Sequence, residues 1–295
     1  MDGLAPDEAV LFVAFGHGGR SMVSCDGGHH WVGHRVEETG ASYWGHHEWT
    51  ARELVAQGGW FLAASGWGAP KRVRRSRDGI VWEDALARGE GGATWSGVAT
   101  ENAVVLGQAT RGQRSLDGGE TWERFSPPGH GKGLFGYGRG TVIVVSLGSE
   151  PLVAWSDDDG ASWTASPLTG AERRCLDSAR APGDGGGHFL FGSGRGDGCV
   201  SGDKGRSWER GAPVPGGGVA SFATVGTRIR AYASDGVFET SDGRDWTWLG
   251  EAPALAEVTG NETSGHVGLA TRVVWVSDAG VSWTEAAHPR EGPAL

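Results

Sequence analysis

Short apolar runs separated by glycine-rich turns fill the chain. In one stretch, residues 134–137, 141–147 and 151–156 each predict a strand, and Trp163 opens a fourth. The apolar positions show no convincing period of 3.6 residues, so we expect almost no helix. The pattern predicts an all-β fold built from units of four short strands.

A recurring sequence, Ser-x-Asp-x-Gly-x-x-Trp, marks these units. Four copies fit it completely, and they span Ser24–Trp31, Ser115–Trp122, Ser156–Trp163 and Ser201–Trp208. Two copies are one residue shorter, at Ser76–Trp82 and Thr240–Trp246. A seventh keeps Asp278, Gly280 and Trp283, with Val276 at the serine position. Seven units of about 42 residues have the length of four-stranded propeller blades.

Each copy has the chemistry of a self-contained hairpin lock. The Asp carboxylate accepts hydrogen bonds from the backbone N–H groups of its own turn. Glycine supplies the positive φ that the turn requires, and Trp covers the turn as the next strand begins. We therefore interpret all seven copies as structural.

With these seven hairpins the chain resembles the Asp-box, or BNR, repeat of sialidase-like β-propellers. The resemblance covers nearly the whole chain and implies one domain, residues 1–295, folded as a seven-bladed β-propeller of four-stranded antiparallel blades. In that family the box joins the third and fourth strands, away from the ligand-binding face. The expected blades are approximately 1–37, 38–88, 89–127, 128–168, 169–213, 214–251 and 252–288.

The first repeat lacks a full innermost strand. We expect either residues 1–8 or the tail, residues 288–295, to supply this strand and close the ring. Closure removes free sheet edges.

Composition argues against some classes of protein and of binding partner. Hydrophobic residues make up 38% of the chain, which argues against disorder. The net charge of -10 argues against general nucleic-acid binding. No apolar stretch is long enough for a membrane span and no signal peptide is visible, although the resemblance favours an extracytoplasmic location. We expect a monomer. Cys175 and Cys199 fall in one repeat and either pair or remain two thiols.

One long segment is the leading site candidate. Residues 37–49 lie between blades 1 and 2, on the expected ligand face, where long loops carry function. The residues expected to bind ligand are Tyr43, Trp44, His46, His47, Glu48 and Trp49, with Arg111 and Arg195 from other loops. We therefore expect a ligand-binding propeller that takes a carbohydrate, peptide or other polar molecule at the channel mouth.

Histidines add a metal hypothesis. The residues expected to converge on the same face are His17, His46, His47 and His130. Such a cluster suits a transition metal (Zn, Cu, Fe or Mn). The alternative is that they are hydrogen-bonded surface residues, because no sequential ligand motif supports the site.

Two other classes of function remain open. The first is an enzyme of the glycosidase, lyase or metal-dependent oxidase type in the same pocket, for instance through the carboxylates Asp177 and Asp197. Sialidase activity itself is disfavoured, since the chain lacks the Arg-Ile-Pro element of sialidases. The second is a non-catalytic assembly scaffold. It would dock through the basic run Lys71, Arg72, Arg74, Arg75 and Arg77, by analogy with similar photosystem II assembly factors; cross-strand acid partners are the alternative for that run.

Overall fold

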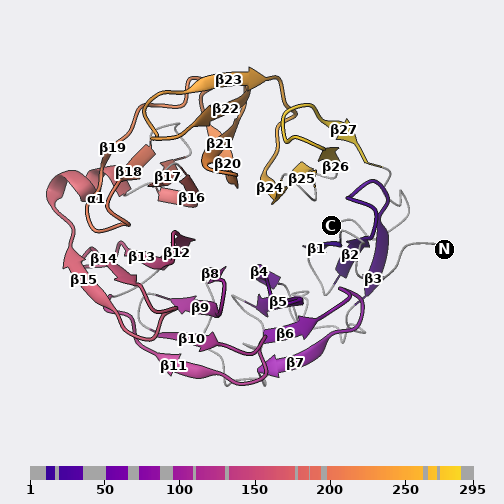
Figure 1. The fold of residues 1–295 in the computed structure, drawn as a ribbon, viewed down its shortest axis with the longest axis horizontal. Helices are drawn as coiled ribbons and strands as arrows, with labels where there is room; N and C mark the ends of the chain where they lie inside the picture. The colour runs from indigo at the N-terminus through magenta and orange to yellow at the C-terminus, as the bar shows by residue number, and fades with distance from the viewer. Residues whose placement is uncertain are drawn as a thin grey trace, which may run out of the picture.

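The protein is a seven-bladed β-propeller in which antiparallel sheets surround a central channel (Figure 1). The predicted fold class is confirmed. A computed structural model describes residues 11–16, 20–35, 51–65, 73–86, 96–108, 111–129, 133–176, 179–185, 187–193, 198–261, 265–270 and 273–286. Within these ranges six blades have four strands and blade 1 has three.

The strands follow one another outward from the channel in each blade. Blade 1 contains β1 (Phe12–Gly16), β2 (Arg20–Ser24) and β3 (Val32–Arg35). Blade 2 contains β4 (Ala51–Gln57), β5 (Trp60–Ser65), β6 (Val73–Ser76) and β7 (Glu83–Leu86). Blade 3 contains β8 (Ser96–Ala99), β9 (Val104–Gln108), β10 (Arg111–Ser115) and β11 (Glu123–Phe125). Blade 4 contains β12 (Gly133–Gly138), β13 (Thr141–Ser146), β14 (Leu152–Ser156) and β15 (Thr164–Pro167).

The remaining blades follow the same order. Blade 5 contains β16 (Ala179–Gly185), β17 (His188–Ser193), β18 (Gly198–Ser201) and β19 (Glu209–Arg210). Blade 6 contains β20 (Val219–Val225), β21 (Arg228–Ala233), β22 (Gly236–Thr240) and β23 (Thr247–Gly250). Blade 7 contains β24 (Glu257–Asn261), β25 (Gly265–Ala270), β26 (Val273–Ser277) and β27 (Thr284–Glu285).

A short helix, α1 (Gly170–Leu176), lies in the connection between blades 4 and 5. Its first turn is a capping box, because Thr169 N donates to Glu172 Oε2 at 2.8 Å and Glu172 N donates to Thr169 Oγ1 at 3.3 Å. A disulfide between Cys175 and Cys199 fastens α1 to β18. Of the two states left open for these cysteines, the structure has the bonded one. Within the described residues, no helix has the length and apolarity that a membrane crossing requires.

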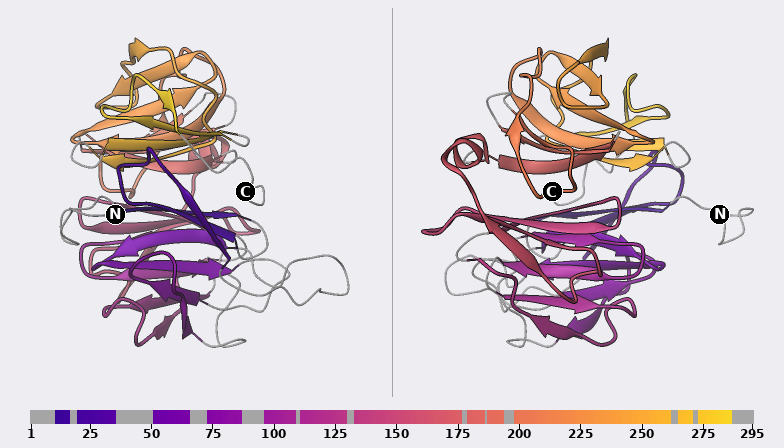
Figure 2. Two further views of the ribbon diagram at one scale, coloured as in Figure 1. Left: turned by 90° about the vertical axis from the view of Figure 1, so that its right-hand side faces the viewer. Right: turned by 60° about the vertical axis from the view of Figure 1, so that its left-hand side comes forward.

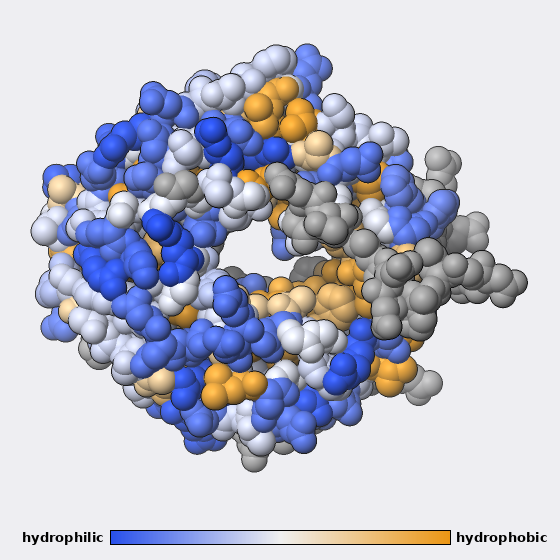
Figure 3. All heavy atoms as spheres, in the orientation of Figure 1, coloured by the Kyte–Doolittle hydropathy of each residue, from blue (hydrophilic) through white to orange (hydrophobic). Residues whose placement is uncertain are grey.

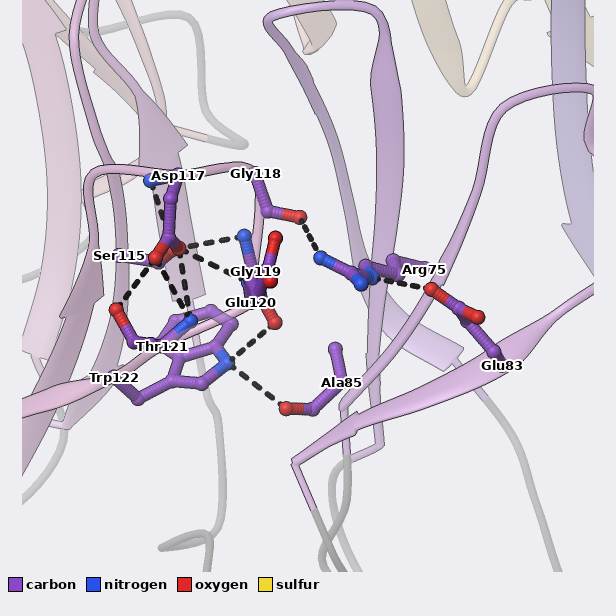
Figure 4. Close-up of polar contacts among 10 residues, drawn as sticks. All are labelled: Arg75, Glu83, Ala85, Ser115, Asp117, Gly118, Gly119, Glu120, Thr121 and Trp122. Carbon is purple, nitrogen blue, oxygen red and sulfur yellow. Dashed lines mark hydrogen bonds and ion pairs between the residues drawn. The ribbon is translucent and has the colours of Figure 1, made fainter.

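The hairpins of the Ser-x-Asp repeat, which we call Asp boxes for short, hold their own turns as expected. In blade 3, Ser115 Oγ donates to Asp117 Oδ1 at 2.7 Å, and Gly119 N donates to Ser115 Oγ at 2.8 Å (Figure 4). Partial burial acts to raise the pKa of Asp117. Hydrogen bonds from Thr121, Ser115 and Glu120 outweigh that effect and lower the pKa from 3.8 to about 2.

The same hairpins also join neighbouring blades. A Cβ on Gly79 would lie 2.5 Å from Val13 of blade 1, and one on Gly205 would lie 2.6 Å from Ile143 of blade 4. Both glycines also have positive φ, so only glycine fits these positions. A Cβ on Gly28 would likewise lie 2.6 Å from Val267, which shows that blade 1 packs on blade 7 and the ring closes there (Figure 2).

The seventh box differs from its sequence-based alignment. Ser277 pairs with His266 of the second strand, as Ser76 pairs with Phe61 in blade 2. Ser277, not Val276, therefore holds the serine position, and the prediction of a missing serine was wrong. Ala279 then occupies the aspartate position, since Asp78 also follows its serine by two residues. Among the described residues the buried Ser277 hydroxyl has no hydrogen-bond partner, because Ala279 provides no carboxylate to accept from it.

Candidate functional site

The ring of innermost strands has a gap at blade 1. The strands β4, β8, β12, β16, β20 and β24 line the channel and contact one another in series (Figure 1). Between β24 and β4, the described residues provide no further innermost strand. The innermost strand of the described blade 1 is β1, which corresponds to the second strand of the other blades.

A cavity of about 410 Å³ occupies this gap. We call it the blade 1 recess. Apolar side chains make up much of its wall, and apolar atoms are visible on one side of the central opening (Figure 3). Its lining residues are Leu11–Phe15 and Trp31 of blade 1, Glu53–Ala56 and Phe61 of blade 2, and Glu257, Thr259, Gly260, Val267 and Leu269 of blade 7. The volume lies in the range typical of small-ligand sites.

β1 presents one backbone edge to the recess. On its other edge, all five residues of the strand pair with β2. Its side chains pack against the two neighbouring blades. Phe12 and Ala14 belong to a hydrophobic cluster with Val267 of blade 7, and the Phe15 ring lies 4.7 Å, centroid to centroid, from the Trp82 ring of blade 2. Both faces of β1 are therefore covered, and within the described residues its inner edge has no strand partner.

Polar groups enter the recess from β24. Side chains alternate along a strand, and Val258 packs toward blade 6, so Glu257 and Thr259 point the other way, toward blade 1. The Glu257 side chain is exposed, yet the surrounding protein raises the pKa of its carboxyl by desolvation. Glu53 lies on the opposite side of its strand, with its Cγ beside Gly97 of blade 3. Both glutamates line the recess, and Glu257 is the one whose carboxyl pKa is raised.

One end of the recess lies on the face opposite the Asp boxes. Turns between first and second strands contact the boxes: Asn102 Nδ2 donates to Asp159 Oδ2 at 3.1 Å, and the His188 ring lies 3.2 Å from Ser241 O. The opposite ends of the innermost strands therefore belong to the other face. Glu257 stands at such an end, as the first residue of β24.

Most of the predicted site residues lie outside the described part of the chain. These are Tyr43, Trp44, His46, His47, Glu48, Trp49, His17, His130 and Arg195. Two of the corresponding segments join the described structure at the recess. His17 follows Gly16, the last residue of β1, and the 37–49 segment is followed by β4, whose Leu54 lines the recess.

Arg111 is the one predicted ligand-binding residue that the structure describes. It is exposed at the start of β10 in blade 3, and it does not line the recess. Within the described residues, no group of three or more metal-ligating side chains comes together. The ligand and metal sites expected from the sequence remain predictions.

The basic run of blade 2 is held by partners within the fold. Arg74 Nε lies 3.1 Å from Asp84 Oδ1, and Arg75 Nε lies 2.6 Å from Glu83 Oε1. Arg75 also donates to Gly118 O of the next blade (Figure 4). Its guanidinium stacks over the ring of Trp60 at 4.4 Å. The predicted cross-strand acid partners are confirmed, and they hold these two arginines against the neighbouring strand of the same blade.

A second polar cluster lies on the face of the propeller that carries the Asp boxes. Burial raises the pKa of Asp184, while Thr224 Oγ1 donates to its Oδ1 at 2.9 Å and the charge of Arg139 acts the other way. Arg139 in turn donates to Gly187 O at 2.8 Å. These contacts link blades 4, 5 and 6 and satisfy one another, so we interpret the cluster as structural.

Comparison with known proteins gives the fold. No protein-family model and no curated protein matches the sequence. Among solved structures, YCF48 from Cyanidioschyzon merolae is similar at 15% identity, with 96% of this chain and 97% of that chain covered and a TM-score of 0.58. YCF48 bound to D1 peptide is similar at 15% identity, over 81% of each chain, with a TM-score of 0.55. A catalytically inactive virginiamycin B lyase from Staphylococcus aureus with quinupristin is similar at 9% identity, over 81% of this chain and 84% of that chain, with a TM-score of 0.61.

Proposed function

We propose that the protein is a ligand-binding propeller whose site is the blade 1 recess at the channel mouth. The ligand is a carbohydrate, a peptide or another polar molecule. The observation that carries this proposal is the cavity itself: apolar side chains and the carboxylate of Glu257 line it, beside the edge of β1 that has no strand partner among the described residues. A few polar groups in an apolar concavity are typical of ligand sites.

Similar propellers support the proposal. One of the similar structures holds a peptide and another holds quinupristin. The aromatic residues and histidines of the 37–49 segment would extend the recess from its rim, and a metal held by His17, His46, His47 and His130 remains part of the hypothesis.

The enzyme alternative is less well supported. A glycosidase requires two carboxyl groups facing one cleft. The pair suggested by the sequence, Asp177 and Asp197, lies outside the described residues, and of the two glutamates that line the recess only Glu257 has a raised pKa. The scaffold alternative loses Arg74 and Arg75, because the fold already uses them.

A plugging substitution tests the proposal. Ala56 is exposed in the recess, so Ala56→Trp would fill it without disturbing the core. Ala99→Trp is the matched control, because Ala99 pairs with Val104 as Ala56 pairs with Phe61, and Ala99 lies outside the recess.

The measurement is binding to glycan and peptide arrays. Ligands that bind the unmodified protein should be retained by Ala99→Trp and lost by Ala56→Trp. Retention of every such ligand by a folded Ala56→Trp variant would show that the recess is not the site.

A further inference from the structure

We propose that the seventh box is a carboxylate-binding site, in which the anion of a ligand takes the place of the side-chain carboxylate that Ala279 does not provide. The ligand class is a carboxylate, either a small free acid or the C-terminal end of a peptide. This inference goes beyond the proposed function and does not depend on the blade 1 recess. It is carried by the donors of the turn, by the buried Ser277 hydroxyl and by comparison with the other boxes.

The boxes of blades 2 and 6 have the same length as the seventh box and show what such a turn holds. In blade 2, Asp78 Oδ1 accepts hydrogen bonds from Ile80 N at 2.8 Å and from Val81 N at 2.9 Å. Ser76 Oγ donates to the same oxygen at 3.0 Å. In blade 6 the equivalent backbone N–H groups lower the pKa of Asp242. A box of this length therefore favours the anionic form of the carboxylate that it holds.

The seventh box keeps these donors and lacks the acceptor. Val281 and Ser282 follow the box glycine, as the two backbone donors do in blade 2. Gly280 has a φ of 68°, close to the 71° of the glycine in blade 2, so the turns are alike at this point. Within the described residues, nothing accepts a hydrogen bond from the N–H groups of Val281 and Ser282. An ionised carboxylate has two oxygens and can accept from several donors at once.

The buried hydroxyl of Ser277 points to the same missing group. Ser277 is 7% exposed, and its pairing with His266 places it at the serine position of the box. In blade 4 the equivalent hydroxyl, that of Ser156, donates to Asp158 Oδ1 at 2.7 Å. The Ser277 hydroxyl has no hydrogen-bond partner among the described residues. A buried hydroxyl without a partner is costly, and a bound carboxylate would accept from it.

Blade 6 adds a positive charge next to this turn. At the position of Arg230 the other blades carry aliphatic side chains that pack on the glycine of the next box, such as Ile143 against Gly205. Arg230 instead forms an ion pair with Glu239 and donates to Ala279 O, in the turn itself. A guanidinium in contact with the turn favours an anion there.

One acid lies in the same turn. Asp278 is exposed, and its charge opposes binding of an anion. In blade 4 the exposed Asp157 occupies the same position, and the turn still holds the carboxylate of Asp158, which accepts from Ser162 N at 2.8 Å. An acid at this position is therefore compatible with a carboxylate in the turn.

The test uses sodium acetate as the probe and the full chain at pH 7. Acetate replaces chloride at constant ionic strength, while heteronuclear NMR follows the backbone amides of Val281 and Ser282. Both resonances should shift and saturate in the millimolar range that a single small anion allows.

A tripeptide arm distinguishes the two sources of the carboxylate. N-acetylated trialanine with a free carboxylate is compared with its C-terminal amide. The amide should not bind. Binding of the free peptide roughly tenfold tighter than acetate would identify a peptide end as the ligand, and equal binding would identify a small acid.

Three variants test the position of the anion. Ala279→Asp supplies a carboxylate from the chain and should abolish the response to acetate. Ser277→Ala should weaken acetate binding roughly fivefold, with no loss of Tm in the absence of acetate, because its hydroxyl has no partner to lose. Ser156→Ala is the matched control: it should lower the Tm, because it loses the bond to Asp158, and leave the response to acetate unchanged.

Three results would overturn the inference. Unchanged amide resonances when acetate replaces chloride would show that the turn has no preference for a carboxylate. A response that survives in Ala279→Asp would place the anion elsewhere. Equal acetate binding by Ser277→Ala and Ser156→Ala would exclude the buried hydroxyl as a donor to the ligand.

Discussion

The Asp-box hairpins and the blade 1 recess are built from the same repeat, yet they are held in different ways. In each of the first six boxes a carboxylate closes its own turn, and the Gly packs on the preceding blade. The recess is bounded by strands from three blades, and one edge of β1 has no strand partner in the described structure. The contrast indicates that the repeat builds the frame, and that a cavity arises where the repeat is interrupted.

The largest expected loss of stability comes from removing the disulfide of blade 5, which fastens the connection between blades 4 and 5 to β18. Among the described residues, blade 1 has no such bond. Cys199→Ser should lower the free energy of unfolding by about 3 kcal/mol, because the closed loop restricts the unfolded chain. Urea unfolding under oxidising conditions measures the change. Cys25→Ser, at an exposed free thiol, is the control and should have no effect.

The next largest loss of stability is expected when the aspartate of a box is replaced. Asp158→Ala should cost about 2 kcal/mol, since Ser156, Ser162 and the turn lose their acceptor. Asp278→Ala should cost less than about 0.5 kcal/mol, because the strand register excludes Asp278 from the box position. Equal losses for the two variants in urea unfolding would refute that register.

The seventh box can be repaired. Ala279→Asp should raise the free energy of unfolding by about 1 kcal/mol, because the new carboxylate can accept from the buried Ser277 hydroxyl and from the turn. Ala279→Leu is the matched control and should give no gain. A Tm for Ala279→Asp at or below that of the unmodified protein would contradict this assignment.

The smallest effect is the pH dependence of the free energy of unfolding. It has opposite signs at Asp117, in a box, and at Glu257, in the recess. The pKa of Asp117 is lowered to about 2, so its stabilisation is present above 3.8 and is lost as pH falls toward 2. The pKa of Glu257 is raised above 4.5, so its charged form destabilises the fold at neutral pH and protonation relieves this.

Glu257→Gln should therefore be slightly more stable than the unmodified protein at pH 7, by no more than about 0.5 kcal/mol because the side chain is exposed. The difference should disappear below pH 4. Urea unfolding at pH 7 and pH 3.5 measures both values, and a larger difference at the lower pH would reverse the assigned sign.

The frame could be predicted from the sequence because its determinants are local. Ser156, Asp158 and Trp163 interact within a few residues, and the motif repeats the same geometry. The strands expected at residues 134–137, 141–147 and 151–156 are present as β12, β13 and β14. The seventh box misled the alignment, because Asp278 lies one residue from the position that strand pairing assigns.

The recess could not be predicted in the same way. Phe12, Ala56 and Glu257 are far apart in the sequence, and nothing local indicates that they share a cavity. One signal was present: the first repeat is too short for a full innermost strand. The missing strand bears on ring closure, and it also locates the cavity.

Amide hydrogen exchange along β1 tests the central claim most directly. With an open inner edge, the recess-facing amides of residues 12–16 should exchange quickly in the isolated protein and become protected when ligand binds. The amides of β5, which pairs on both edges, should be protected throughout. Protection of all β1 amides in the isolated protein, equal to that of β5, would contradict the account.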